Sequence, residues 1–205
     1  MLTKNLIRII NSYKFSLIIV IFFELLYLIL GYKGNRFNFS KDIVKSDNLP
    51  CPYYFLFKIK KILHKTDFYN FLDLGCGSGR VIDFFNKNFP DKNLTGIEYF
   101  EEQYKYSQKI FCNEKNIKII KEDFTKINFL QYNIDCFFFN EPFKKNSESI
   151  DFIEKIVNLP FKKKIIFIFV NGNRKIIDQI KNINCIESFY VSDNKGYSIY
   201  SSKEI

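Results

Sequence analysis

Residues 71–80 constrain the fold of this chain more than any other stretch. They read Phe-Leu-Asp-Leu-Gly-Cys-Gly-Ser-Gly-Arg, so a strand-like apolar run leads directly into glycines at alternate positions. Glycines at this spacing let a backbone turn tightly and approach a ligand closely, and a helix that starts behind them offers free N–H groups. The stretch predicts a strand-to-helix turn. Whether its glycines serve a ligand or only the geometry of the turn stays open from this pattern alone.

Beyond residue 49 the chain alternates strand-like and helix-like segments, which predicts βαβ units and a mainly parallel sheet. The runs 135–140 and 165–170 are rich in apolar residues, as central strands buried on both faces are. The turn signal Asp-Asn-Lys-Gly at 193–196 predicts that the last two strands form an antiparallel hairpin. We expect an α/β fold with a seven-stranded sheet and helices on both faces. Strands are expected at 70–74, 93–98, 117–121, 134–140, 164–170, 185–191 and 196–201, and helices at 53–63, 79–88, 101–114, 147–159 and 174–182.

The N-terminal part contains an almost continuous apolar run at residues 15–30, with Glu24 at its centre. The small-residue cleavage site of a signal peptide does not follow it. A membrane span needs about 20 mostly apolar residues, and an acid at its centre is unfavourable. A membrane span, a membrane-surface helix and a helix packed on the rest of the chain stay open. We divide the chain into residues 1–48, an apolar helix with a polar connector, and residues 49–205, one α/β domain.

Composition narrows the classes of function. The chain has 31 Lys and Arg against 22 Asp and Glu, a net charge of +9, but these basic residues are scattered. We therefore do not expect nucleic acid as a partner. The five cysteines form no C-x-x-C pair, so we expect no disulfide framework, no metal site and a reducing, cytoplasmic location. His64 is the single histidine, which leaves no Ser-His or Cys-His dyad unless His64 itself serves.

Asp73 lies two residues ahead of Gly75, Gly77 and Gly79, and this acid bears on which ligand the turn fits. The dinucleotide fingerprint spaces its glycines as G-x-G-x-x-G, whereas these alternate as G-x-G-x-G. An acid in this position would repel a pyrophosphate. It suits a ligand that carries an ammonium group and a sulfonium.

Further candidate residues follow the next three predicted strands. Glu98 ends the second strand, where a carboxylate can accept from both hydroxyls of a ribose, and it would otherwise be an exposed acid at a strand end. Asp123 follows the third strand and could accept from an adenine amino group while Phe124 lines the base. Asn140-Glu-Pro-Phe follows the fourth strand at 140–143, where an Asn carbonyl could hold a target amine. The plainer interpretation is that Pro stops this strand and Asn caps the turn.

In this order, the motifs resemble the class I S-adenosylmethionine-dependent methyltransferases, over about residues 50–202. The resemblance implies a Rossmann-like fold and S-adenosyl-L-methionine as the cofactor. It implies that the aspartate and glycines of the turn hold the methionine part of the cofactor, that Glu98 holds the ribose and that Asp123 holds the adenine. The residues that it implies are Asp73, Gly75, Gly77, Gly79, Glu98, Asp123 and Phe124 for the cofactor, and Asn140, Pro142 and Phe143 for catalysis.

More narrowly, the chain is similar to small bacterial methyltransferases with an N-terminal aromatic-proline segment, here residues 49–54, which would cover the cofactor. Amine-directed members usually have two prolines after the Asn or Asp, and Glu141 stands at the first of these here. The acceptor, a small molecule, a glycan or a protein, therefore stays open. The apolar helix also resembles that of membrane-anchored protein-lysine N-methyltransferases, which would place residues 15–30 at the cytosolic face of a membrane. An NAD(P)-binding oxidoreductase and a non-catalytic membrane-associated module are the alternatives of other classes.

Overall fold

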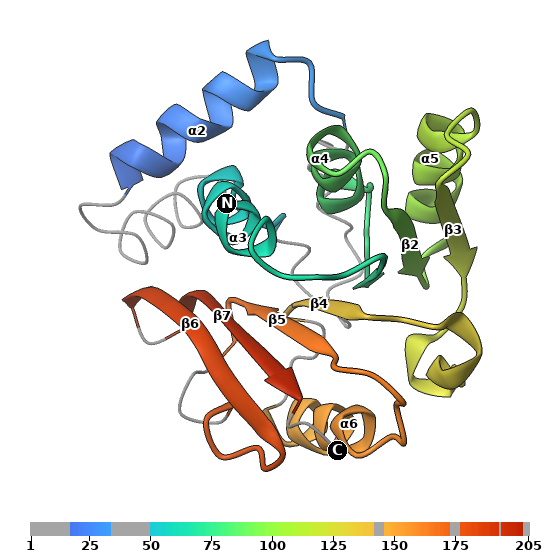
Figure 1. Ribbon diagram of the computed structural model, residues 1–205. Coiled ribbons are helices and arrows are strands. Elements are labelled where there is room, and N and C mark those ends of the chain that lie inside the picture. Colours follow the sequence, from blue (N-terminus) through green and yellow to red (C-terminus); the bar gives the residue numbers. More distant parts are fainter. Residues whose placement is uncertain (1–16, 34–49, 142–145, 173–176, 193, 203–205) are drawn as a thin grey trace.

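The computed structural model describes residues 17–33, 50–141, 146–172, 177–192 and 194–202. The strands are β1 (Asn70–Leu74), β2 (Asn93–Glu98), β3 (Ile117–Lys121), β4 (Cys136–Asn140), β5 (Ile166–Val170), β6 (Ile183–Ser192) and β7 (Lys195–Ser202). They form one seven-stranded sheet in the order β3-β2-β1-β4-β5-β7-β6 (Figure 1). Pairs from β3 to β5 are parallel, and β7 runs antiparallel to both β5 and β6. The predicted mainly parallel sheet with a C-terminal antiparallel hairpin is confirmed.

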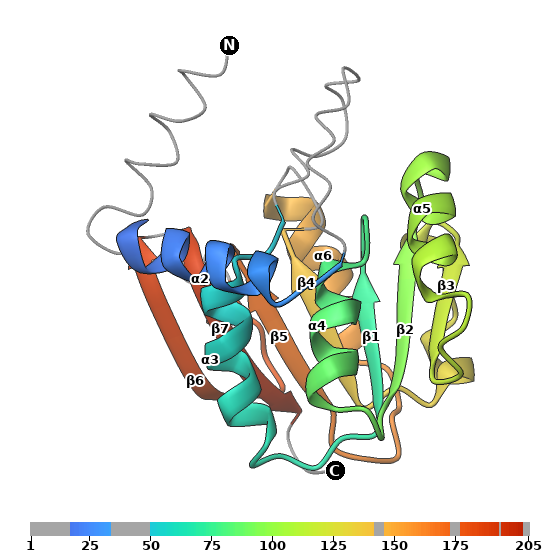
Figure 2. The same ribbon diagram turned by 90° about the horizontal axis from the view of Figure 1, so that it is seen from above.

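Helices cover both faces of this sheet. They are α2 (Leu17–Ile29), α3 (Tyr53–Leu63), α4 (Arg80–Asn88), α5 (Glu101–Phe111) and α6 (Asn146–Val157). Helices α3, α4 and α5 lie on one face with α2 outside them, and α6 lies on the other (Figures 1 and 2). Each face has its own cluster of buried apolar side chains, so the helices on both faces that the sequence predicts are confirmed.

Stacked aromatic rings hold the central strands β4 and β5 together. The ring centroids of Phe137 and Phe167 are 5.7 Å apart, and those of Phe139 and Phe169 are 4.9 Å apart. Both pairs lie directly opposite each other in the register of the two strands. Such pairs stabilise a sheet beyond the apolar area that they bury. They fix the carboxyl ends of the central strands, where ligands bind in open α/β sheets.

The apolar N-terminal segment forms α2, which packs on the domain through one side. Val20 and Tyr27 are buried, and Tyr27 stacks on Tyr53 of α3 with ring centroids 4.7 Å apart. Of the three alternatives, the helix packed on the rest of the chain therefore describes this side of α2. Among the described residues, no helix combines the length and the apolar character that crossing a membrane requires. The domain boundary predicted between residues 48 and 49 falls outside the described residues and stays a prediction.

Two connections pack beside the cluster of buried apolar side chains on the α6 face of the sheet. Between β3 and β4 the chain forms only two 3-10 helices, η2 (Phe124–Lys126) and η3 (Phe129–Tyr132). Of the helix predicted at 174–182, residues 174–176 lie outside the described residues, and the part predicted beyond residue 177 is wrong, because the chain there is turn and not helix before β6 begins. Asn182 there has a φ of +66°, a left-handed conformation that an α-helix cannot contain.

Candidate functional site

The turn at residues 75–79 has the geometry that its glycines predict. Gly75, Gly77 and Gly79 have φ values of +79°, +55° and +85°, all in the left-handed region that favours glycine. A Cβ at Gly79 would lie 2.4 Å from the ring of Phe111, whereas a Cβ at Gly75 would meet no described atom within 4 Å. The turn therefore needs glycine for its backbone at each position, and at Gly75 it also borders open space.

Asp73 lies beneath this turn with its carboxyl group buried. It is 2% exposed, and its Oδ2 hydrogen-bonds to no group that the structure describes. Burial, and then the charge of Glu98, raises the pKa of Asp73 to about 8. It borders a cavity of about 40 Å³ lined by Pro50, Cys51, Asp73, Gly75, Cys76, Gly77, Ser78, Arg80, Val81 and Asn140. A buried acid in this state is suited to a cationic group of a ligand.

Glu98 joins the turn to the next strand. Its Oε2 accepts a hydrogen bond from the N–H of Gly77 at 2.8 Å, and its Oε1 accepts one from the N–H of Phe100 at 2.7 Å. Burial raises the pKa of this carboxyl, while these two backbone donors lower it. A carboxylate has about four lone-pair sites, so Glu98 can hold the turn and still accept from a ligand hydroxyl.

Asp123 and Phe124 lie one strand further along the same edge, after β3. Oδ1 of Asp123 accepts from the N–H of Thr125 at 3.0 Å and from its hydroxyl at 2.7 Å, so this carboxylate caps η2. The ring of Phe124 packs edge-on against Phe152 of α6, with centroids 5.3 Å apart. Their predicted roles around an adenine stay predictions.

Asn140 ends β4 on the other side of the turn, and its Oδ1 accepts a hydrogen bond from Nδ2 of Asn171 at 3.1 Å. Asn171 follows β5, is 3% exposed and has a φ of +56°. Sequence analysis missed Asn171, although a polar residue directly after an apolar strand at this edge was a usable signal. Pro142 and Phe143 lie outside the described residues, so their assignment to catalysis stays a prediction.

Arg80, the first residue of α4, is the second functional candidate that sequence analysis missed. It is 4% exposed and lines the same cavity as Asp73. Its Nη1 nevertheless lies 2.8 Å from Oε2 of Glu24 in α2. A buried arginine requires such a partner, because an unpaired buried charge is strongly destabilising. The N-terminal helix therefore contributes a charge to the surroundings of the turn.

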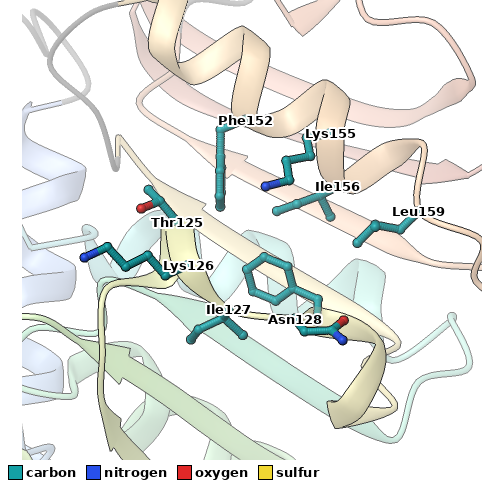
Figure 3. A pocket seen from close by; sticks show the side chains of 9 residues that line it. Thr125, Lys126, Ile127, Asn128, Phe152, Lys155, Ile156 and Leu159 are labelled. Atoms are coloured by element: carbon teal, nitrogen blue, oxygen red, sulfur yellow. The ribbon is translucent and has the colours of Figure 1, made fainter.

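A larger cavity, of about 260 Å³, lies on the other face of the sheet, between α6 and the 3-10 connection (Figure 3). Its walls include Phe129, Phe152 and Ile156, and Lys126 and Lys155 are its charged residues. None of the acids or glycines of residues 73–98 lines it. Because ligand sites in open α/β sheets lie at the carboxyl edge, the smaller cavity at the turn is the candidate site.

One family model matches this chain. Residues 71–159 match the family model described as a methyltransferase domain, a stretch that begins in β1 and contains the glycine turn, Glu98, Asp123 and Asn140. Among curated proteins, none matches the sequence significantly.

Solved methyltransferase structures share the fold at low sequence identity. The plantazolicin methyltransferase BpumL in complex with SAH is 14% identical with a TM-score of 0.54, and the match covers 72% of this chain and 80% of that one. A methyltransferase from Geobacter sulfurreducens is 12% identical with a TM-score of 0.55, covering 72% and 77%. The mitomycin 7-O-methyltransferase MmcR is 9% identical with a TM-score of 0.52, covering 75% and 55%. The Rossmann-like methyltransferase fold is therefore confirmed.

The raised pKa of Asp73 predicts a stability cost that depends on pH. Between the ordinary pKa of about 4 and the folded value of about 8, the folded chain binds a proton that the unfolded chain releases, so stability falls as pH rises. The side chain of the Asp73→Asn variant cannot ionise, so this substitution removes the pH dependence that Asp73 contributes to stability. Urea unfolding at pH 6 and pH 8 should show the wild type losing about 2 kcal/mol more than the variant between the two values. Equal losses would contradict the raised pKa.

Proposed function

We infer that this chain is an S-adenosylmethionine-dependent methyltransferase of the Rossmann-like class. The observation that carries the inference is Oδ2 of Asp73, which is buried beside three glycines of positive φ and has no hydrogen-bond partner among the described residues. The donor brings an ammonium group, which would supply a positive partner for this oxygen. A pyrophosphate would instead meet a buried acid, and this disfavours the alternative of an NAD(P)-dependent oxidoreductase.

The described residues suit the parts of the donor in the order of the strands. We propose that Asp73 and the turn hold the methionine part, where the open space beside Gly75 allows close approach of a ligand. Glu98, whose carboxylate is already oriented by the N–H groups of Gly77 and Phe100, would accept from the ribose hydroxyls. Asp123 at the end of β3 would accept from the adenine amino group, with Phe124 beside the base.

Bound S-adenosylmethionine supplies an electrophilic methyl group on sulfur, which an acceptor attacks in line. The contribution of the protein is therefore mainly alignment, which can lower the barrier substantially without a strong base when the acceptor is a neutral amine. We propose that the acceptor approaches at the end of β4, where Asn171 orients the amide of Asn140. An oxygen acceptor would more often need a base.

The class of acceptor does not follow from the fold, because the same fold serves different acceptors. The names of two structural neighbours illustrate this, since one is a plantazolicin methyltransferase and the other a mitomycin 7-O-methyltransferase. A small molecule, a glycan and a protein, including a lysine side chain of a membrane protein, are the acceptor classes to be tested. Incubating cell extract with a labelled donor, with and without the protein, would separate them by fraction.

Two glycines form a matched pair for testing donor binding. Gly31 and Gly75 both have positive φ, and a Cβ at either would meet no described atom within 4 Å. An alanine at either position therefore imposes a similar backbone strain, of about 1–2 kcal/mol, but only Gly75 borders the cavity. By calorimetry with S-adenosylhomocysteine, Gly75→Ala should weaken binding about tenfold or more, and Gly31→Ala should stay within about twofold.

Binding by the wild-type protein is the decisive measurement of that experiment. If it binds neither S-adenosylmethionine nor S-adenosylhomocysteine at millimolar concentration, the inferred activity is wrong, and a non-catalytic module becomes the better description. Tight binding of NAD or NADP would favour the oxidoreductase. Equal effects of the two alanine substitutions would mean that the turn is not where the donor binds.

We also propose that the outer face of α2 lies on a membrane surface. The end of α2 and the residue after it carry Leu28, Ile29 and Leu30, which are 58–82% exposed. The one charged residue of the helix, Glu24, pairs inward with Arg80, so no acid faces outward. An exposed apolar patch of this kind is rare on a monomer, and interfacial helices bury such a face among lipid headgroups. The exposed large apolar residues of this face are Ile18, Ile19, Ile21, Phe22, Leu25, Leu28, Ile29 and Leu30.

Vesicle sedimentation tests this surface. The wild type should pellet with vesicles of phosphatidylcholine and phosphatidylglycerol, and Phe22→Asp combined with Leu25→Asp should abolish pelleting. Tyr69→Asp is the matched control, because Tyr69 is a large exposed side chain, 53% exposed, outside α2. Wild-type protein that stays in the supernatant, or a control variant that loses binding equally, would contradict the proposal.

A further inference from the structure

Glu24 occupies an unusual position, because the central acid of an apolar helix points into the domain. Its Oε1 accepts a hydrogen bond from the N–H of Tyr53 at 2.9 Å, and its Oε2 accepts one from Nη1 of Arg80 at 2.8 Å. Tyr53 is the first residue of α3, and Pro52 before it supplies no side-chain cap. Glu24 therefore satisfies a backbone donor that the start of a helix leaves open and, at the same time, neutralises a buried arginine.

Arg80 is the residue that this arrangement restrains. Its guanidinium lies over the ring of Tyr53, 4.6 Å from the centroid, and its Nη1 also donates to the carbonyl of Cys51 at 3.3 Å. Arg80 and Asp73 line one small cavity, yet Arg80 is paired with Glu24 while Oδ2 of Asp73 has no described partner. The available cation is thus held by a carboxylate from a different helix.

The buried thiol of Cys51 shows that these three charges share one environment. Burial raises the pKa of this thiol, the positive charge of Arg80 lowers it, and the negative charges of Asp73 and Glu24 raise it further. Because Arg80 and Asp73 line the same small cavity, a guanidinium released from Glu24 would have Asp73 as a nearby carboxylate. A carboxyl with a guanidinium partner ionises readily, and its site for a second cation is then occupied.

We propose that Glu24 is a positioning residue for donor binding, an inference that rests on the proposed function. Glu24 keeps the guanidinium of Arg80 away from Asp73, so that the Asp73 carboxyl remains available for the ammonium group of the donor. The apolar N-terminal helix is then part of the donor site as well as a surface for lipid. Donor binding depends on a contact between residues 56 positions apart in the sequence.

The test compares binding of S-adenosylhomocysteine to full-length variants by calorimetry. Glu24→Gln removes the charge that holds Arg80, and we expect it to weaken binding about tenfold or more at pH 7. Adding Arg80→Gln removes the competing guanidinium and should restore most of the lost affinity. A purely structural role of Glu24 would not produce this rescue, because the second substitution removes a further buried contact.

Lys87→Gln is the matched control. Lys87 also ties the end of α2 to α4, since its Nζ donates to the carbonyl of Gly31 at 2.9 Å, but it does not line the cavity at the turn. It should leave binding within about twofold of the wild type. If Lys87→Gln weakens binding as much as Glu24→Gln, docking of the helix and not the position of Arg80 controls the site, and the proposal is wrong.

The pH dependence gives a second readout. Wild-type affinity should rise between pH 6 and 8 as Asp73, with its pKa of about 8, ionises on binding, whereas Glu24→Gln should flatten this rise because Arg80 already ionises Asp73. Among the described residues, the other titratable or charged groups that act on this region are Glu24, Cys51, Cys76, Arg80 and Glu98. Apart from Glu24 they are the same in the wild type, in Glu24→Gln and in the Lys87→Gln control, so comparing Glu24→Gln with the other two isolates the change at Glu24.

The remaining outcomes also test the proposal. A Glu24→Gln variant that binds within twofold of the wild type, or a double variant that binds no better than the single one, overturns the proposal. A wild type that does not bind S-adenosylhomocysteine overturns the proposed function instead. Should Glu24→Gln not fold, Glu24→Asp tests the same contact, because its shorter side chain cannot reach both Tyr53 and Arg80. Weaker binding is then expected, and wild-type binding would overturn the proposal.

Discussion

Burial of the Asp73 carboxyl beneath the glycine turn opposes its ionisation, and the rest of the site is arranged around that constraint. The carboxyl is removed from water and faces the charge of Glu98, which raises its pKa to about 8. A protein selected for stability alone would place an amide or an apolar side chain there. In the proposed complex the ammonium group of the donor stabilises the ionised carboxylate, so binding selects a cationic ligand and releases the proton of Asp73.

The same region holds a buried arginine that could have neutralised Asp73. Instead, Arg80 is neutralised by Glu24 of α2, and Glu98 is engaged with backbone N–H groups of the turn. The positive charge of Arg80 and the carboxyl of Asp73 are therefore both present, but Arg80 is paired with Glu24. This distribution requires α2, which also presents an exposed apolar face on its outer side.

Much of the architecture could be predicted from the sequence because its signals are local. The apolar runs of β1, β2 and β3 are bounded by polar residues and turns, and their predicted bounds agree with the structure. The glycine spacing with Asp73 ahead of it predicts the turn and the chemistry of its ligand, because both depend on neighbouring residues. The order of the acids after successive strands followed from the parallel topology, which brings strand ends to one edge.

The parts that could not be predicted depend on contacts between distant residues. Glu24 and Arg80 are 56 positions apart, and an acid within an apolar run looked like an obstacle to membrane insertion rather than the partner of a buried arginine. Asn171 acquires a role only because β5 lies beside β4, where its amide reaches Asn140. The ring of Phe124 packs toward Phe152 of α6, a direction that the sequence around it does not specify.

The most direct test of this account counts the protons that donor binding releases. Calorimetric titration of wild-type protein with S-adenosylhomocysteine at pH 7, in buffers of different ionisation enthalpy, gives that number. With the pKa of Asp73 at about 8 in the free protein and an ionised carboxylate against the ammonium group in the complex, close to one proton should be released per ligand bound. Binding with no proton release would show that Asp73 is already ionised or does not meet the ammonium group, and would contradict the central claim.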